Sequence, residues 1–147
     1  MHRQTFLESV LPSPGGLLEA NACRNPLLAA AVTIALGAFG HGFLGVKPVA
    51  AAVAASTLPA NVVAVIWIVW YFVSACMLTF GGLLAWAWPG LRPGSPSRAA
   101  AALIVGALYF FTGIASYIYS GREPFWLLFV AQGFIVIGST LLLRMAP

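Results

Sequence analysis

The stretch ANVVAVIWIVWYFVSACMLTFGGLLAWAW, residues 60–88, contains no charged side chain, and it decides the fold class. A helix rises about 1.5 Å per residue, so about 20 apolar residues cross the hydrocarbon core of a bilayer. Residues 60–88 exceed that need. The stretch therefore predicts a transmembrane helix that tilts or projects beyond the bilayer.

Composition extends this reading to the whole chain. Of the 147 residues, 61% are hydrophobic and 7% are charged. A soluble domain carries about 25% charged residues, so a water-exposed surface cannot be built from this sequence. We expect an integral membrane protein in contact with lipids. The net charge of +4 comes from basic residues scattered singly, which excludes a nucleic-acid partner.

Three more spans are predicted around the first. One covers residues 26–46, because Asn25 and Pro26 resemble a cap followed by proline at the first helical position. The others cover residues 99–119 and 124–143, and the Pro- and Gly-rich stretch at 89–98 is the clearest loop. The predicted fold is all-α and polytopic, with four transmembrane helices (about 26–46, 60–88, 99–119 and 124–143) bundled in a domain over 26–147.

Two shorter segments complete the expected organisation. Residues 1–25 are predicted to form an N-terminal segment along the cytoplasmic membrane surface, with a capping box from Thr5 to Glu8. Pro48 and Pro59 bracket an Ala- and Val-rich stretch, which we expect to form a brief interfacial or re-entrant helix.

The basic residues predict the orientation. In a four-span arrangement, one side of the membrane has Lys47 and Arg122, and the other side has Arg3, Arg24, Arg92, Arg98 and Arg144. Because cytoplasmic loops carry the excess of Lys and Arg, both termini are predicted to be cytoplasmic.

The predicted spans contain few side chains that could act as catalytic acids, bases or nucleophiles. No Asp, Glu, Lys or Arg lies well inside a predicted span, which argues against a proton-coupled transporter. His41 is the only base that Ser74 or Ser116 can use, and no carboxylate orients it, which argues against a hydrolase. We expect no catalytic residue, no metal site and no intrinsic cofactor.

Polar and aromatic side chains nevertheless recur at one depth in all four spans, about 10 Å below the outer surface by helix rise. This predicted polar layer comprises His41, Trp67, Tyr71, Thr112, Ser116 and Gln132. It has three interpretations. The first is a hydrogen-bonded network in which neutral His41 pairs with Tyr71, Gln132 or a backbone carbonyl. The second is contact with a pigment, quinone or lipid, and the third is a metal or redox role.

Glycines on the predicted spans indicate close helix packing, since each costs about 1 kcal/mol relative to alanine in a helix interior. Around His41 we expect either a neighbouring helix or a flat ligand to fill the space that their missing side chains leave. The candidate packing glycines are Gly37, Gly40, Gly42, Gly45, Gly106 and Gly113.

The segments HGFLG in the first span, LPANVVAVIWIVWYFVSACMLTFGGLLAWA in the second and FVAQGFIVIGSTLLL in the fourth resemble a group of small, uncharacterised four-span bacterial membrane proteins. That group has a His in the first span, a Trp-His pair in the second and a Pro-Gln pair in the fourth. Here His41, Trp70 and Gln132 match, whereas Tyr71 and Ala131 depart from the pattern, so a two-histidine metal site would be lost. The resemblance implies the bacterial cytoplasmic (inner) membrane and no particular activity.

The expected role is a non-catalytic accessory or scaffold subunit of a larger respiratory, photosynthetic or transport complex, with other membrane subunits as partners. The alternative is a binding protein or small transporter for an apolar ligand (quinone, lipid or pigment) that uses the polar layer around His41.

Overall fold

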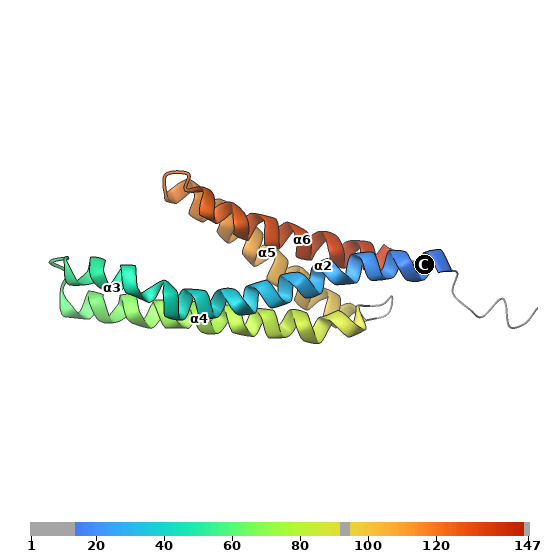
Figure 1. Cartoon of the computed structure of the whole chain (residues 1–147), viewed down its shortest axis with the longest axis horizontal. Helices are drawn as coiled ribbons and strands as arrows, with labels where there is room; N and C mark the ends of the chain where they lie inside the picture. The colour runs from blue at the N-terminus through green and yellow to red at the C-terminus, as the bar shows by residue number, and fades with distance from the viewer. Residues whose placement is uncertain (1–13, 92–94, 146–147) are drawn as a thin grey trace, which may run out of the picture.

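The computed structural model describes residues 14–91 and 95–145, and its described residues form helices and connecting turns without a strand. The long helices are α2 (Pro14–Phe39), α4 (Ala60–Ala87), α5 (Pro96–Tyr119) and α6 (Leu127–Met145). A π-helical turn, η1 (Gly40–Leu44), joins α2 to α3 (Val46–Ala54). Short 3-10 turns, η2 (Trp88–Gly90) and η3 (Pro124–Trp126), follow α4 and precede α6 (Figure 1).

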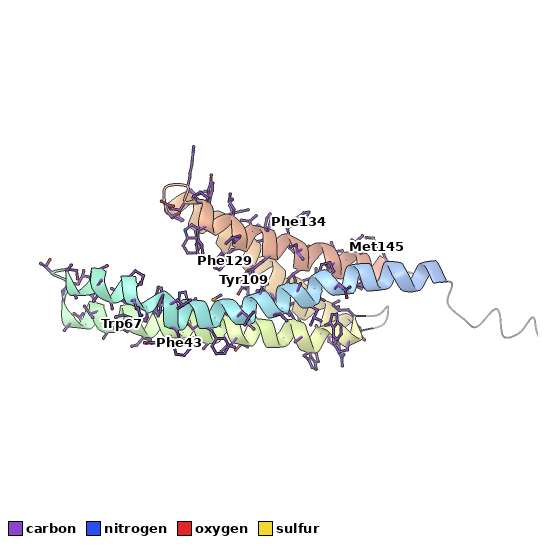
Figure 2. All side chains as sticks on the ribbon, viewed as in Figure 1. Phe43, Trp67, Tyr109, Phe129, Phe134 and Met145 are labelled. Carbon is purple, nitrogen blue, oxygen red and sulfur yellow. The ribbon has the colours of Figure 1, made fainter. Side chains whose placement is uncertain are left out.

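Four helical segments are long and apolar enough to cross a membrane: Asn25–Ala54, Ala60–Gly90, Pro96–Tyr119 and Pro124–Met145. The prediction of an all-α bundle of four such helices is confirmed. Large apolar side chains cover much of the outside of the bundle, among them Phe43 and Phe134 (Figure 2), which are 70% and 68% exposed. This surface is compatible with a multi-pass membrane protein, because lipid tails solvate apolar side chains.

The chain forms two antiparallel hairpins that pack against each other. We call them the first hairpin (α2, η1, α3 and α4) and the second hairpin (α5 and α6). Between them, α2 packs on α6 and α4 packs on α5. The hairpins meet at the end where α6 finishes, and they diverge toward the α3–α4 and α5–α6 turns (Figure 1).

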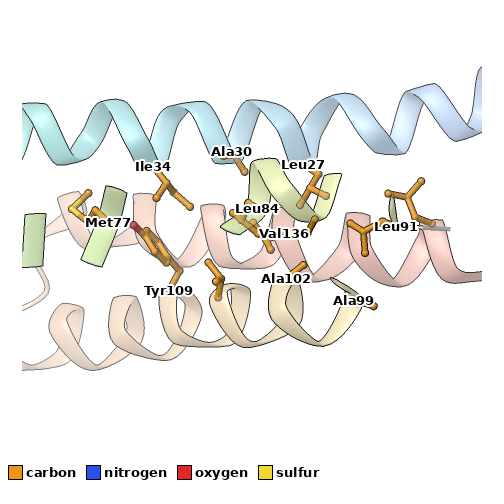
Figure 3. Packing of buried hydrophobic residues seen from close by; sticks show 14 of the residues in the cluster. Leu27, Ala30, Ile34, Met77, Leu84, Leu91, Ala99, Ala102, Tyr109 and Val136 are labelled. Carbon is orange, nitrogen blue, oxygen red and sulfur yellow. The ribbon is translucent and has the colours of Figure 1, made fainter. Parts of the chain in front are cut away.

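The core lies where the hairpins meet. Leu27, Ile34, Leu84 and Val136 are fully buried there, and they come from α2, α4 and α6 (Figure 3). Near the start of α5 the core residues are alanines, among them Ala102, which is also fully buried. Small residues let helix backbones approach closely, which is the packing that helices in lipid favour.

Helices α5 and α6 approach each other closely at glycines. A Cβ added at Gly133 would strike the backbone nitrogen of Phe110 and come within 2.6 Å of the Gly106 carbonyl oxygen. A Cβ at Gly113 would lie 2.7 Å from the Val130 nitrogen. Only glycine permits this spacing, so the backbones themselves form the contact.

The first helix extends beyond the predicted span at both ends, although its apolar segment of membrane length begins at Asn25, next to the predicted start. Asn25 does not cap the helix, since α2 begins at Pro14 and contains Pro26 in its interior. An interior proline removes one backbone donor and crowds the preceding turn, and long apolar helices accommodate both effects by local adjustment. The expected capping box at Thr5 lies outside the described residues.

The segment after Val46 also differs. α3 follows η1 and continues roughly along the direction of α2, rather than forming a separate interfacial or re-entrant helix (Figure 1). Pro48 does not break the helix, although a proline ring clashes with the carbonyl four residues earlier, here that of Leu44. Leu44 ends the π-helical turn, and we attribute the continuity to this wider turn, which accommodates the proline.

Candidate functional site

A π-helical turn carries His41. The Gly45 N–H donates to the Gly40 carbonyl at 3.0 Å, a bond that spans five residues instead of four. Such turns are rare and often occur at functional sites, because the extra residue re-aims the side chains around it. The candidate site is therefore taken as this turn and the side chains that contact it.

His41 packs against α4 through two neighbours one helical turn apart. Its imidazole stacks on the Trp70 indole, with ring centroids 3.8 Å apart and ring planes 19° apart. Its Nδ1 lies 2.9 Å from the Ser74 Oγ. The histidine thus bonds one helix of the first hairpin to the other, through a stack and a hydrogen bond together.

The Ser74 hydroxyl also has a neighbour in its own helix. Its Oγ lies 3.3 Å from the Trp70 carbonyl oxygen, so it is within hydrogen-bond distance of both the backbone and the His41 imidazole. The direction of the His41–Ser74 bond follows the tautomer of the histidine.

Glycines let the indole and the turn meet. A Cβ on Gly45 would lie 2.9 Å from Cζ2 of Trp70, and one on Gly42 would lie 3.4 Å from the Ser74 Oγ. A Cβ on Gly37 would lie 2.9 Å from the Met77 methyl. A neighbouring helix, α4, therefore fills the space beside these three glycines. Gly40 departs from the packing prediction, since a Cβ there would meet nothing within 4 Å.

The six residues of the predicted polar layer do not join into one network among the described residues. Tyr71 is 55% exposed and stacks on Trp67 of its own helix, with centroids 6.3 Å apart. The Gln132 amide donates to the Thr33 Oγ1 at 3.3 Å, linking α6 to α2. The expected partners of His41, namely Tyr71, Gln132 or a backbone carbonyl, were therefore wrong, because Ser74 occupies that role.

The last two residues of the layer lie on α5, away from His41. Ser116 is half-buried, and Thr112 is exposed to the outside and also lines a cavity described below. Sequence reasoning missed Trp70 and Ser74 as the partners of His41. Their spacing of four residues, which places two side chains on one helix face, was the available signal.

A second feature is an apolar cavity of about 190 Å³ where the two hairpins begin to diverge. Tyr109 and Phe129 lie beside each other at this place, on the side of the second hairpin that faces the first (Figure 2). The cavity is lined by Val73, Cys76, Met77 and Phe80 of α4, by Leu108, Tyr109 and Thr112 of α5, and by Phe129 of α6.

Tyr109 is the least exposed of the residues that line the cavity. It is 5% exposed, and its ring stacks on Phe129 and meets the edge of Phe80, at centroid distances of 5.5 Å and 6.2 Å. Its hydroxyl is buried and has no hydrogen-bond partner among the described residues. Burying an unpaired hydroxyl among apolar side chains costs free energy, so the Tyr109 hydroxyl requires an explanation.

Metal binding finds no support in the described part of the chain. Residues 14–91 and 95–145 contain no group of three or more His, Cys, Asp or Glu side chains placed to hold an ion. The free thiol of Cys76 lies in the cavity and not beside His41.

Comparison with protein-family models, curated proteins and solved structures finds no match to this chain. The site geometry alone therefore carries the functional argument.

Proposed function

We propose that this protein is a non-catalytic accessory or scaffold subunit of a larger membrane complex, in the bacterial cytoplasmic membrane and with both termini in the cytoplasm. The observation that carries the proposal is the exposure of α4. Only 6% of its most apolar window is buried within the described chain, against 28% or more for each of the other three helices.

The length of the first hairpin also supports a role as a subunit of a larger complex. The spans Ala60–Gly90 and Pro96–Tyr119 have 31 and 24 residues, which correspond to about 46 Å and 36 Å of helix. Because the hairpins also diverge, α3 and the first half of α4 form an arm that extends away from the second hairpin (Figure 1).

The outer face of the arm is suited to another protein's helix. Ile68 and Phe72, one helical turn apart on α4, are 68% and 65% exposed, and Trp67 and Tyr71 lie beside them. Large aromatic side chains are enriched at protein interfaces. The occupant we propose is a transmembrane helix of a different subunit, laid along α4.

Mild-detergent purification of the tagged chain from its native membrane tests the proposal. We expect a stoichiometric partner that is lost from the double variant Ile68→Ala/Phe72→Ala. The matched control is Ile104→Ala/Phe111→Ala, which shortens two α5 side chains that are 61% and 66% exposed and should retain the partner.

Recovery of the wild-type chain only as a monomer or a homo-oligomer would overturn the proposal. Equal retention of the partner by both double variants would place the interface elsewhere than on α4.

A further inference from the structure

We propose that the cavity beside Tyr109 is a binding site for an apolar molecule that carries a carbonyl group, whose oxygen accepts a hydrogen bond from the Tyr109 hydroxyl. This binding site does not depend on the assembly role of α4, since it lies between the hairpins and not on the outer face.

The first step of the argument is the state of the hydroxyl. Tyr109 is more than nine-tenths buried, and its O–H has no partner among residues 14–91 and 95–145. In Figure 3 the hydroxyl points toward Met77, whose thioether is at most a weak acceptor. Buried tyrosine hydroxyls ordinarily have a hydrogen-bond partner. The simplest acceptor for the Tyr109 hydroxyl is therefore an atom of a bound molecule.

The second step is the chemistry of the cavity. Its walls are aromatic and aliphatic, with the Cys76 thiol and the Thr112 hydroxyl as further polar groups. No Asp, Glu, Lys, Arg or His side chain lines it. Such walls suit an uncharged, apolar molecule, and a donor hydroxyl selects a molecule that offers an acceptor oxygen.

The third step is size. A cavity of about 190 Å³ is smaller than the roughly 300–1,000 Å³ of sites that enclose a whole drug-sized ligand. It therefore holds one end of a longer molecule, whose remainder extends between the diverging hairpins toward lipid. Met77 is unbranched, and its flexible thioether can shift as the carbonyl reaches the hydroxyl.

This chemistry has two sources in a membrane, the head group of a lipid-soluble quinone and the ester of an acyl lipid. The experiment uses the full-length chain in nanodiscs of ether-linked phospholipid, which lacks ester carbonyls, with and without a decyl-substituted benzoquinone. A parallel sample uses ester-linked phosphatidylcholine without quinone. Infrared spectra then report whether a carbonyl band moves to lower frequency.

We expect a lowered carbonyl band in one of the two samples, and that sample identifies the source. Tyr109→Phe should abolish the shift, and in the quinone case it should weaken binding about three- to tenfold, the value of one hydrogen bond. Tyr117→Phe, a half-buried tyrosine on the same helix that does not line the cavity, is the matched control and should change neither.

A second variant separates binding from folding. Thr112→Phe places a ring in the cavity from its exposed rim and should exclude the molecule while leaving the Tyr109 hydroxyl in place. Without ligand, Tyr109→Phe should unfold at the same temperature as wild type or higher, because it removes an unpaired buried group. Identical carbonyl spectra for wild type, Tyr109→Phe and Thr112→Phe in both nanodisc types would overturn the proposal.

Discussion

At the residue scale, His41 is a connector between two helices rather than a lone base. Its stack on Trp70 and its bond to Ser74 both reach α4, and no carboxylate joins them. A histidine without such neighbours would be costly inside a span. The pairing explains how this residue is accommodated between the two helices.

A double-mutant cycle of His41→Phe with Ser74→Ala measures this bond. Phenylalanine keeps a ring against the indole but removes the nitrogen that bonds Ser74. Side-chain hydrogen bonds in membrane proteins average about 0.6 kcal/mol with a maximum near 1.7 kcal/mol, so we expect a coupling energy in that range. Unfolding titrations in mixed micelles provide the measurement.

The control cycle pairs His41→Phe with Thr79→Ala. The Thr79 hydroxyl bonds the Ala75 carbonyl of its own helix at 2.9 Å, so coupling to His41 should be close to zero. Equal coupling in the two cycles would contradict the assigned bond.

The close packing of glycines beside His41 could be predicted from the sequence, but the partner of His41 could not. Helical spacing places residues on faces only while the turn keeps its ordinary width. The π-helical turn begins one residue before His41 and changes that register. The expected partners were Tyr71, Gln132 or a backbone carbonyl, and the structure instead places the imidazole against Ser74 and Trp70.

At the scale of elements, the α5–α6 contact depends on glycine. Backbone touches backbone around Gly133, so a methyl group there has no space. The same helix offers a comparison at Gly138, where an added Cβ would meet nothing within 4 Å.

Gly133→Ala should therefore separate α5 from α6 and destabilise the bundle by about 1–3 kcal/mol, as overpacking does. Gly138→Ala should be neutral or stabilising by up to about 1 kcal/mol, because alanine favours the helix. Thermal unfolding in detergent compares the two variants with wild type. A loss at Gly138 as large as that at Gly133 would show that helix propensity, and not the contact, sets the effect.

The positions of the second, third and fourth spans could be read from the sequence to within a few residues. Their apolar length and the flanking Pro and Gly residues are local signals. The start of the first helix could not be read in the same way, because α2 begins at Pro14, before the predicted span. Pro26 is compatible with a helix start and with a helix interior, and only packing distinguishes the two.

At the scale of the whole molecule, the bundle gives a direct test of orientation. The α3–α4 and α5–α6 turns lie at the end where the hairpins diverge, and the start of α5 lies toward the opposite end (Figure 1). Ser56, Ser97 and Ser120 are exposed at these places.

In a variant without Cys23 and Cys76, we expect Ser56→Cys and Ser120→Cys to react with a membrane-impermeant maleimide in intact cells. Ser97→Cys should react only after permeabilisation, because the excess of basic residues keeps its side of the chain in the cytoplasm. The reverse pattern would invert the proposed topology, and labelling of all three sites in intact cells would contradict membrane insertion.

The pairing of neighbours along the chain has a consequence for biogenesis. The most extensive helix contacts are between α2 and α4 and between α5 and α6, which carry consecutive candidate membrane spans. Each hairpin can therefore close as soon as its second helix has been synthesised, before the other hairpin exists. Assembly then reduces to one late docking event between two preformed halves, with the Gln132–Thr33 hydrogen bond among the last contacts to form.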